Sequence, residues 1–339
     1  MYHLINKLSI MIAVSLTVVL LSGCSSFYAW NKDEEKLVSD TGFYFDTVIQ
    51  LSIFHEDGEA LLDECFLMCQ ELENTFSKTK EGSELYKVNH RVDNQVVISD
   101  DLAYVIGLGL KYGELTEGAF DITICPVSDL WDFKSDNPVM PSDGEIQKAL
   151  EKVDYRKVHL ETKDENVNQE NVLTFEEDDT MLDLGAIAKG YAADKLKAYL
   201  TVQGVESGYI NLGGNVLTIG VKTNGESWNI GIQEPFTDRG TVLETVEVND
   251  QSVVSSGIYE RYFEMDGKIY HHVLNPKTGY PVETDLDQIT VVCDESAVGD
   301  VVSTSCLLLG EERAKALMEE TGFSNIWLHL SDRCAMIKQ

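Results

Sequence analysis

The chain has 339 residues, of which 58 are acidic and 26 are basic, so its formal net charge at pH 7 is −32. Hydrophobic residues make up 43% and charged residues 25%, which is typical of a folded globular protein and excludes a disordered chain. A surface this acidic repels phosphate backbones and anionic lipid headgroups, which excludes nucleic-acid binding and charge-driven membrane adhesion as main roles. An anionic ligand therefore needs a local device, such as a metal ion, a lysine or a helix N-terminus.

Residues 1–23 predict a signal peptide. Lys7 provides a positive start, and the apolar run Leu8–Leu21 is shorter than the roughly 20 residues that a membrane-spanning helix needs. The following Leu21-Ser22-Gly23-Cys24 resembles the lipobox of bacterial lipoproteins, in which the cysteine is acylated and becomes the mature N-terminus. An ordinary signal peptide or an uncleaved anchor are the alternatives. We expect a lipid on Cys24, a tether over residues 24–42, and a mature protein held to the cell membrane outside the cytoplasm.

Residues 43–339 predict one α+β domain. Its first half predicts a strand at Phe45–Phe54, a helix at Glu59–Ser77, a helix at Asp100–Thr116, a hairpin within Val158–Met181, and a loop running into a helix at Asp183–Leu200. Its second half predicts strands at Tyr209–Ile219, Trp228–Gln233, Thr241–Val248, Ser252–Tyr259, Arg261–Met265, Lys268–Leu274 and Ile289–Cys293, helices at Val298–Leu309 and Glu311–Thr321, and a last strand at Ile326–Leu330. Strands and helices alternate without a regular βαβ period or a break in composition, which favours a single domain.

Six cysteines remain besides Cys24, and all stand in apolar surroundings: Cys65, Cys69, Cys125, Cys293, Cys306 and Cys334. Cys65 and Cys69 are four residues apart on a predicted helix, which leaves a disulfide or a metal site open. They lie within an apolar stripe, however, and two residues do not make a metal site. Buried free thiols are the favoured interpretation.

Two glycine-containing segments suggest close approach of the backbone to a ligand. In Gly118–Asp121 (GAFD), a glycine precedes a small residue, an aromatic and an acid, which suits contact with a flat ligand or a tight turn. In Asp183–Asp194 (DLGAIAKGYAAD), small residues crowd a predicted helix start, where backbone N–H groups and Lys189 can face an anion. Close packing of the helix on a sheet explains the same small residues.

Three further segments carry polar groups. A glycine pair in Tyr209–Asn215 predicts a bulge or a close ligand contact. His271 and His272 are neighbours on a predicted strand, so at most one of them is expected to face a site. Asp300 and Thr304 are four residues apart on a predicted helix, so they present oxygen atoms on one face. Such hard oxygen ligands suit Mg²⁺, although an aspartate at a helix start also stabilises the helix dipole.

Together and in this order, the segments resemble the ApbE family of flavin transferases (FAD:protein FMN transferases). The matching stretches are FDT at Phe45–Thr47, SKTKEGSEL at Ser77–Leu85, GAFD at Gly118–Asp121, DLGAIAKGYAAD at Asp183–Asp194, NLGGN at Asn211–Asn215, SSG at Ser255–Gly257, HVLNPKTGYPV at His272–Val282 and GDVVSTSCLLLG at Gly299–Gly310. The resemblance covers nearly the whole mature chain and implies a domain of mixed strands and helices related to the T-fold. Many family members are also lipoproteins, which agrees with Cys24.

The resemblance implies Mg²⁺-dependent cleavage of FAD, release of AMP, and attachment of FMN to a Thr or Ser hydroxyl of an acceptor protein outside the cytoplasm. The implied acceptors are flavin-bearing subunits of membrane redox complexes or secreted flavoproteins. Asp300 and Thr304 match the metal-ligating side chains, and Ala186 matches the position that offers the metal a backbone carbonyl. His272 matches the histidine beside the pyrophosphate, the expected base. The matching FAD contacts are Phe45, Thr79, Ala119, Phe120, Asp121, Asp183, Lys189 and Leu274.

The sequence departs from the family at three positions. Asn275 replaces a more usual aspartate, Thr79 replaces an aromatic residue of many relatives, and Ala186 lacks the hydroxyl found in some members. Two other functions remain open. An Mg²⁺-dependent FAD pyrophosphatase would use the same site with water as acceptor, giving FMN and AMP. A non-catalytic flavin-binding lipoprotein would bind FAD without turnover, but it would need neither His272 nor a metal.

Overall fold

The computed structural model describes residues 36–133, 135, 138–165, 168–238, 240–323, 325–330 and 333–338. The predicted signal peptide, Cys24 and most of the predicted tether lie outside these residues. Within the described residues, no helix is both long enough and apolar enough to cross a membrane. The domain begins at β1 (Leu37–Tyr44), so residues 37–42, which the sequence assigns to the tether, belong to a strand. This strand lies at the edge of a sheet and is largely exposed, and for that reason its residues lack a strand's apolar alternation.

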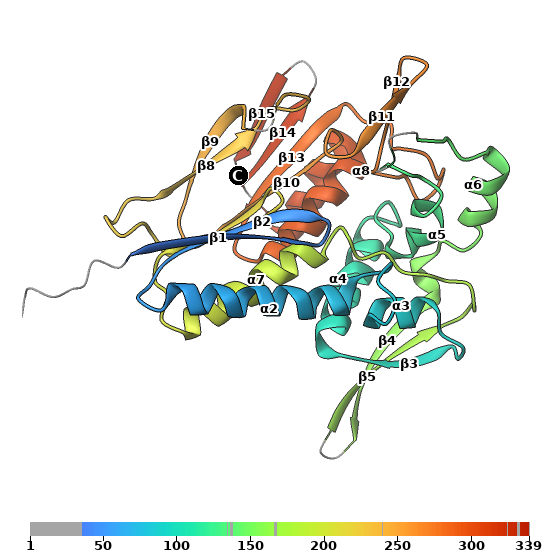
Figure 1. Cartoon of the computed structure of the whole chain (residues 1–339). Coiled ribbons are helices and arrows are strands. Elements are labelled where there is room, and N and C mark those ends of the chain that lie inside the picture. The colour runs from blue at the N-terminus through green and yellow to red at the C-terminus, as the bar shows by residue number, and fades with distance from the viewer. Residues whose placement is uncertain are drawn as a thin grey trace, which may run out of the picture.

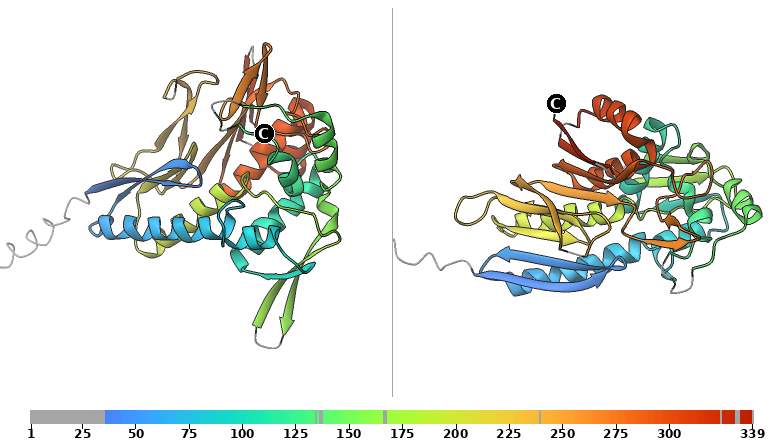
Figure 2. Two further views of the ribbon diagram at one scale, coloured as in Figure 1. Left: turned by 45° about the vertical axis from the view of Figure 1, so that its right-hand side comes forward. Right: turned by 90° about the horizontal axis from the view of Figure 1, so that it is seen from above.

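An eight-stranded antiparallel sheet forms the body of the molecule, with the strand order β1-β2-β6-β7-β10-β13-β14-β15 (Figure 1). The remaining strands of this sheet are β2 (Thr47–Phe54), β6 (Gly208–Leu212), β7 (Asn215–Ile219), β10 (Ser252–Gly257), β13 (Leu286–Cys293), β14 (Asn325–Leu330) and β15 (Arg333–Lys338). Seen from above, β1 and β2 lie at one side of the molecule and the C-terminal strands at the other (Figure 2). The sheet therefore brings distant parts of the chain into one framework.

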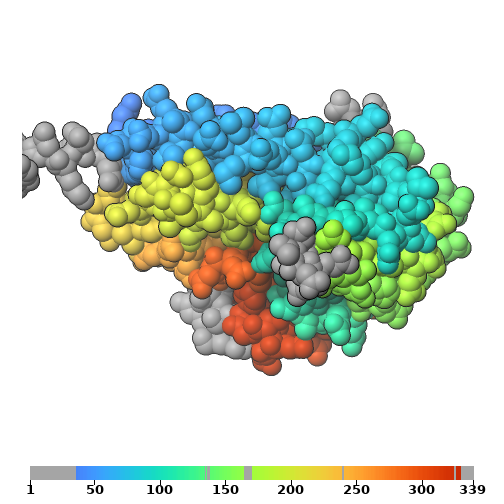
Figure 3. Space-filling model, turned by 90° about the horizontal axis from the view of Figure 1, so that it is seen from below, coloured from blue at the N-terminus to red at the C-terminus, as the bar shows by residue number. Residues whose placement is uncertain are grey.

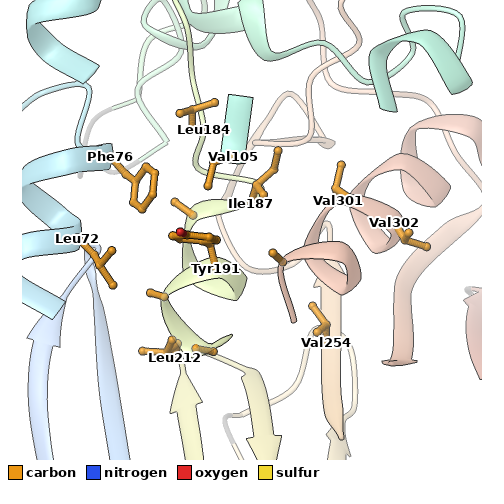
Figure 4. Close-up of a cluster of buried hydrophobic side chains, with 14 of the residues drawn as sticks. Leu72, Phe76, Val105, Leu184, Ile187, Tyr191, Leu212, Val254, Val301 and Val302 are labelled. Carbon is orange, nitrogen blue, oxygen red and sulfur yellow. The ribbon is translucent and has the colours of Figure 1, made fainter. Parts of the chain in front are cut away.

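Three long helices cover one face of the sheet: α2 (Gly58–Phe76), α7 (Ala188–Val202) and α8 (Ser296–Thr321). Seen from below, α2 and α7 lie side by side along this face (Figure 3). Helix α8 packs against α7 and against α4 (Asp100–Leu115), and it is broken at Gly310, where φ is +74°. The apolar sides of these helices form the main core, part of which lies beneath the loop that precedes α7 (Figure 4).

The opposite face of the sheet is covered by a hairpin of β8 (Trp228–Gln233) and β9 (Val242–Val248). A second hairpin, β11 (Tyr262–Met265) and β12 (Lys268–His271), packs on an aromatic cluster next to α5 (Cys125–Ser128) and α6 (Asp143–Leu150). That cluster contains Trp131, Phe133, Phe263, Tyr270 and Tyr280.

A small sheet of order β3-β5-β4 lies beyond the main body, and its hairpin projects away from the molecule (Figure 1). Its strands are β3 (Gln95–Ile98), β4 (Val158–Glu165) and β5 (Asn168–Phe175). Helix α3 (Glu84–Asn89) and the 3₁₀ turns η1 (Ile122–Ile124) and η2 (Tyr155–Lys157) complete the described elements.

The prediction of a single α+β domain is confirmed. One predicted strand is wrong, because Tyr209–Ile219 forms two strands, β6 and β7. Gly213 and Gly214 both adopt positive φ, at +67° and +99°, and turn the chain back on itself. The predicted glycine bulge is therefore the turn of a hairpin.

The prediction of buried free thiols is confirmed for five of the cysteines: Cys65, Cys69, Cys125, Cys293 and Cys306. The side chain of Cys334 lies outside the described part. Burial raises the pKa of Cys65 and Cys69 to about 12, so both thiols stay protonated and unreactive at neutral pH. These two cysteines fill the core side of α2.

Candidate functional site

A buried carboxylate lies at the crossing of α7 and α8. Asp300 is 6% exposed, and its two oxygens accept hydrogen bonds from the Gly190 backbone N–H at 2.6 Å and from Asn215 Nδ2 at 3.0 Å. Burial raises the pKa of Asp300, while the charge of Lys189 opposes that shift. Within the described part of the chain, the carboxylate has no ion pair. Because burial disfavours the charged carboxylate, a cation bound here would stabilise it.

The small residues of the DLGAIAKGYAAD segment allow α7 and α8 to approach closely. A Cβ on Gly190 would lie 2.3 Å from the Ser296 carbonyl oxygen, so no side chain fits at this position. Four residues further on, the Asp194 carboxylate accepts hydrogen bonds from the backbone N–H groups of Ser296 and Ala297, at 2.8 and 2.9 Å. Asp194 therefore caps the start of α8. The helix-packing interpretation of this segment is confirmed for Gly190. The close packing of α7 on α8 also places Asp300 against the Gly190 N–H.

A chain of hydroxyl groups runs from Asp300 to Thr304. The Ser303 hydroxyl donates to the Asp300 carbonyl oxygen at 3.1 Å and lies 2.7 Å from the Ser256 hydroxyl. Ser256 in turn lies 3.2 Å from the Thr304 hydroxyl. Thr304 follows Asp300 by one helical turn, as predicted, and is partly exposed. The Ser255–Gly257 stretch thus supports the residues of α8 from the neighbouring strand.

Lys189 and Ala186 lie at the start of α7. Among the described residues, the Lys189 ammonium forms no ion pair, but its charge lowers the pKa of His272 and opposes the rise at Asp300. Lys189 is therefore close enough to His272 and to Asp300 for its charge to act on both. Ala186 is half-buried against the main core in the turn that precedes α7. Ile187 and Leu184 anchor this turn in the core above Tyr191 (Figure 4).

His272 follows β12 and is half-buried. Its ring atom Nδ1 lies 3.3 Å from the Arg261 carbonyl oxygen, which can only accept, so Nδ1 carries the proton and Nε2 offers its lone pair. Burial, then the positive charge of Arg261, lowers the pKa of His272 to about 4. The imidazole is therefore neutral at pH 7. The neighbouring His271 is 5% exposed, and burial lowers its pKa to about 4 as well.

Asp121 has a structural role in addition to any contact with a ligand. One oxygen accepts from the Thr123 backbone N–H at 2.8 Å and from its hydroxyl at 2.6 Å, and the other accepts from the Tyr155 backbone N–H at 3.0 Å. Phe120 is 4% exposed and belongs to the core, whereas Ala119 is half-buried. Asp121 also borders a hollow of about 420 Å³.

That hollow lies beside the turn that follows His272 but does not include His272 itself. Its lining is mostly polar: Glu114, Glu117, Gly118, Asp121, Val153, Asp154, Tyr155, Arg156, Pro276 and Lys277. The GAFD segment and the NPKTG turn therefore meet at one concave surface. Asn275 shapes this turn, because its side chain accepts a hydrogen bond from the Lys277 backbone N–H at 2.8 Å.

Three other predicted FAD contacts are spread around the site. Phe45 lies not in a strand but in the β1–β2 turn, with φ of +52°, and its N–H donates to Glu73 Oε1 at 2.9 Å. Thr79 is exposed, with its hydroxyl 3.4 Å from that of Ser77. Leu274 is 6% exposed and pairs with Pro281 across the turn, so its side chain belongs to the aromatic core cluster. Their roles toward FAD stay predictions.

Asp183, a further predicted contact, joins a charged cluster that the sequence does not reveal. Its Oδ2 lies 2.8 Å from the Lys78 ammonium and accepts a hydrogen bond from the Ser128 hydroxyl at 2.8 Å. Lys78 and Asn215 both stand inside the stretches that resemble the family, but no spacing rule links them to Asp183 or Asp300. The roles of Lys78 and Asn215 depend on contacts between segments that are far apart in the sequence.

Comparisons with known proteins agree with this geometry. The model of the ApbE family matches residues 45–327. An FAD:protein FMN transferase of Treponema pallidum is 34% identical over 270 residues, which are 77% of this chain and 74% of the relative. One of Klebsiella pneumoniae is 33% identical over 288 residues, which are 85% of this chain and 87% of the relative.

Solved structures give the same result. The flavin transferase ApbE from Vibrio cholerae superposes with a TM-score of 0.77 at 25% identity, over 90% of this chain and 97% of that one. The ApbE protein from Thermotoga maritima superposes with a TM-score of 0.78 at 27% identity, over the same shares of both chains. The fold is that of the flavin transferases. The chain belongs to the ApbE family.

Proposed function

We propose that the protein transfers the FMN half of FAD to a threonine or serine hydroxyl of an acceptor protein, with Mg²⁺ as the metal and AMP as the leaving product. The activity class, FAD:protein FMN transferase, follows from membership of the family. The observation that carries the finer proposal is the buried Asp300 carboxylate, which accepts two hydrogen bonds but forms no ion pair within the described residues. A cation there would neutralise both this charge and a pyrophosphate.

The donors present fit Mg²⁺. Asp300, the Thr304 hydroxyl and the Ala186 carbonyl would hold it, a small set of hard oxygen ligands that leaves room for phosphate oxygens. No three His, Cys, Asp or Glu side chains gather as a metal-ligand group within the described residues. An all-protein cage of such side chains is thus not the type of site we expect. When bound, the metal would supply charge neutralisation at the pyrophosphate.

His272 has the properties that a general base requires. It is neutral at pH 7, and its Nδ1–H is directed to the Arg261 carbonyl, so Nε2 is the atom that can take the proton of the acceptor hydroxyl. The hydroxyl oxygen then attacks the phosphorus of the FMN half, the pyrophosphate bond breaks, and AMP leaves. Lys189 adds a positive charge near both His272 and Asp300, which offsets the repulsion between FAD and an acidic protein.

The cellular setting is also a proposal. The lipobox supports lipidation at Cys24, removal of residues 1–23 and attachment to the cell membrane outside the cytoplasm. The acceptors would then be flavin-bearing subunits of membrane redox complexes or secreted flavoproteins. A lipid anchor makes the acidic surface no obstacle to membrane attachment, because the acyl chains supply the binding energy.

The decisive experiment mixes the purified full-length protein with FAD, Mg²⁺ and a candidate acceptor domain. We expect an added FMN mass on the acceptor and in-gel flavin fluorescence after denaturation, both abolished by EDTA. Free FMN and AMP without an adduct, from a panel of acceptors, would instead indicate an FAD pyrophosphatase. Bound FAD that stays intact would indicate a flavin-binding protein.

A further inference from the structure

Lys78 links three segments of the chain that meet beside the site. Its ammonium lies 2.7 Å from the Ser128 hydroxyl, 2.6 Å from Asp129 Oδ1 and 2.8 Å from Asp183 Oδ2. The side chains of Lys78 and Asp183 are only 22% and 23% exposed. Three short contacts at one ammonium, two of them to carboxylates, distinguish this cluster from an ordinary surface ion pair.

The partner that matters is Asp183, because its carboxylate shapes the loop that leads into α7. Asp183 Oδ1 accepts a hydrogen bond from the Gly185 backbone N–H at 3.0 Å, and the Asp183 N–H donates to the Ile122 carbonyl at 2.8 Å. This fixes the turn just before Ala186 and Lys189. A shift of Asp183 would therefore move the residues proposed to face the metal and the pyrophosphate.

Asp183 needs a cation to stay in this position. Burial would raise the pKa of Asp183, but the charge of Lys78 and its hydrogen bonds hold that pKa below the ordinary value. In the same way, burial would lower the pKa of Lys78, but Asp183 above all raises it beyond the ordinary value. Without the ammonium, the carboxylate would be left half-buried with only neutral donors, and the loop would lose its anchor.

We propose that Lys78 is a positioning residue for FAD: through its contact with Asp183, it holds the loop of residues 183–187 in the conformation that binds the substrate. This proposal rests on the proposed function, in which Asp183 and Lys189 contact FAD. Lys78 itself contacts no substrate in this scheme. Its neighbour Thr79 stands at a predicted flavin contact.

The test compares Lys78→Met with Lys78→Arg in the full-length protein and measures the Kd for FAD by flavin fluorescence, together with KM and kcat. Loss of a charged hydrogen-bond partner predicts a Kd and a KM for FAD about tenfold higher in Lys78→Met. At saturating FAD we expect kcat to stay close to wild type, and we expect Lys78→Arg to restore most of the affinity. Lys80→Met is the matched control, since Lys80 is 44% exposed and lies 3.7 Å from Glu73.

A double variant separates positioning from general stability. If Lys78 acts through Asp183, Lys78→Met combined with Asp183→Asn binds FAD no more weakly than Asp183→Asn alone. Wild-type Kd in Lys78→Met, with only a lower melting temperature, would overturn the proposal, as would a lower kcat at unchanged Kd. If Lys78→Met does not fold, Lys78→Gln takes its place.

Measurements on the wild-type protein distinguish a failure of the proposed function from a failure of the proposed role of Lys78. FAD binding without transfer to any acceptor would contradict the proposed function, while the comparison of Kd values would still decide the role of Lys78. Absence of FAD binding by the wild type would overturn both.

Discussion

His272 illustrates how one backbone contact can define a chemical role. The Arg261 carbonyl accepts the Nδ1 proton, so the reactive nitrogen is assigned by an atom that no substitution of Arg261 removes. The resemblance to the family supplies the position of the histidine, but not its tautomer. That assignment requires the β11–β12 hairpin, which brings residues 261 and 272 together.

Replacing His272 with alanine should separate binding from transfer. In the proposed mechanism the imidazole acts on the acceptor proton rather than on FAD, so we expect the Kd for FAD to stay near wild type while transfer falls by about 100-fold or more. Fluorescence titration and adduct mass spectrometry measure the two quantities. A variant that transfers FMN at the wild-type rate would show that another group is the base.

As the pH falls, kcat/KM should decline at a pH far below the pKa of an ordinary histidine. The pKa of His272 is lowered to about 4, so the base stays unprotonated as the pH falls through 6.5 and is lost only near pH 4. The measurement is kcat/KM between pH 4 and 8 with metal saturating at each pH. An inflection at about 6.5 would mean that the imidazole is solvated during the reaction.

At the residue scale, the sequence predicts which residues form the site better than it predicts which groups hydrogen-bond to them. Residue type and spacing identify Asp300 and Thr304 as metal candidates, while the resemblance to the family distinguishes His272 from its neighbour His271 as the candidate base. The sequence does not reveal that Asn215 and Gly190 donate to Asp300, or that Asp194 caps α8. Those contacts join segments far apart in the sequence, and no local pattern records them.

The crossing of α7 and α8 is the element-scale feature on which the site depends. At Gly190 the two helix backbones are too close for a Cβ, and the Gly190 N–H donates to the Asp300 carboxylate. The helix periodicity of the sequence predicts both helices well. Their crossing follows from a single glycine whose role is visible only when α8 is in place.

Gly190→Ala should therefore disrupt both stability and activity. Its new Cβ would meet backbone atoms rather than a flexible side chain, so we expect a loss of about 2 kcal/mol or more in unfolding free energy. The melting temperature and the rate of FMN transfer would both fall. Gly144→Ala in α6 is the matched control, because nothing lies within 4 Å of a Cβ there. Equal melting temperatures for the two variants would contradict the close crossing.

At the scale of the whole molecule, composition and alternation of strands with helices predict the α+β domain, and the fold confirms it. The strand order of the sheet could not be predicted, since it pairs β2 with β6 across more than 150 residues of sequence. The sequence does not predict the edge strand β1, because an exposed strand carries no apolar pattern.

The proposed lipid anchor makes a prediction about the complete protein. Cys24→Ser should move the protein from the membrane fraction to the soluble fraction, because the acyl chains would be lost. Transfer to a soluble acceptor domain should be unchanged, since the described fold begins only at β1. Fractionation and the adduct assay measure these outcomes. A variant that stays in the membrane fraction would indicate an uncleaved N-terminal anchor instead.

The contacts of Asp300 also bear on the stage of synthesis at which the proposed site can form. They reach back 110 residues to Gly190 and 85 residues to Asn215, and α8 is the last helix among the described residues. A growing polypeptide has Gly190 in α7 and Asn215 in β7 long before it has the carboxylate that accepts their hydrogen bonds. Such long-range closure is a slow step in folding. With Asp300 as the proposed metal ligand, flavin transfer would begin only after synthesis has passed α8.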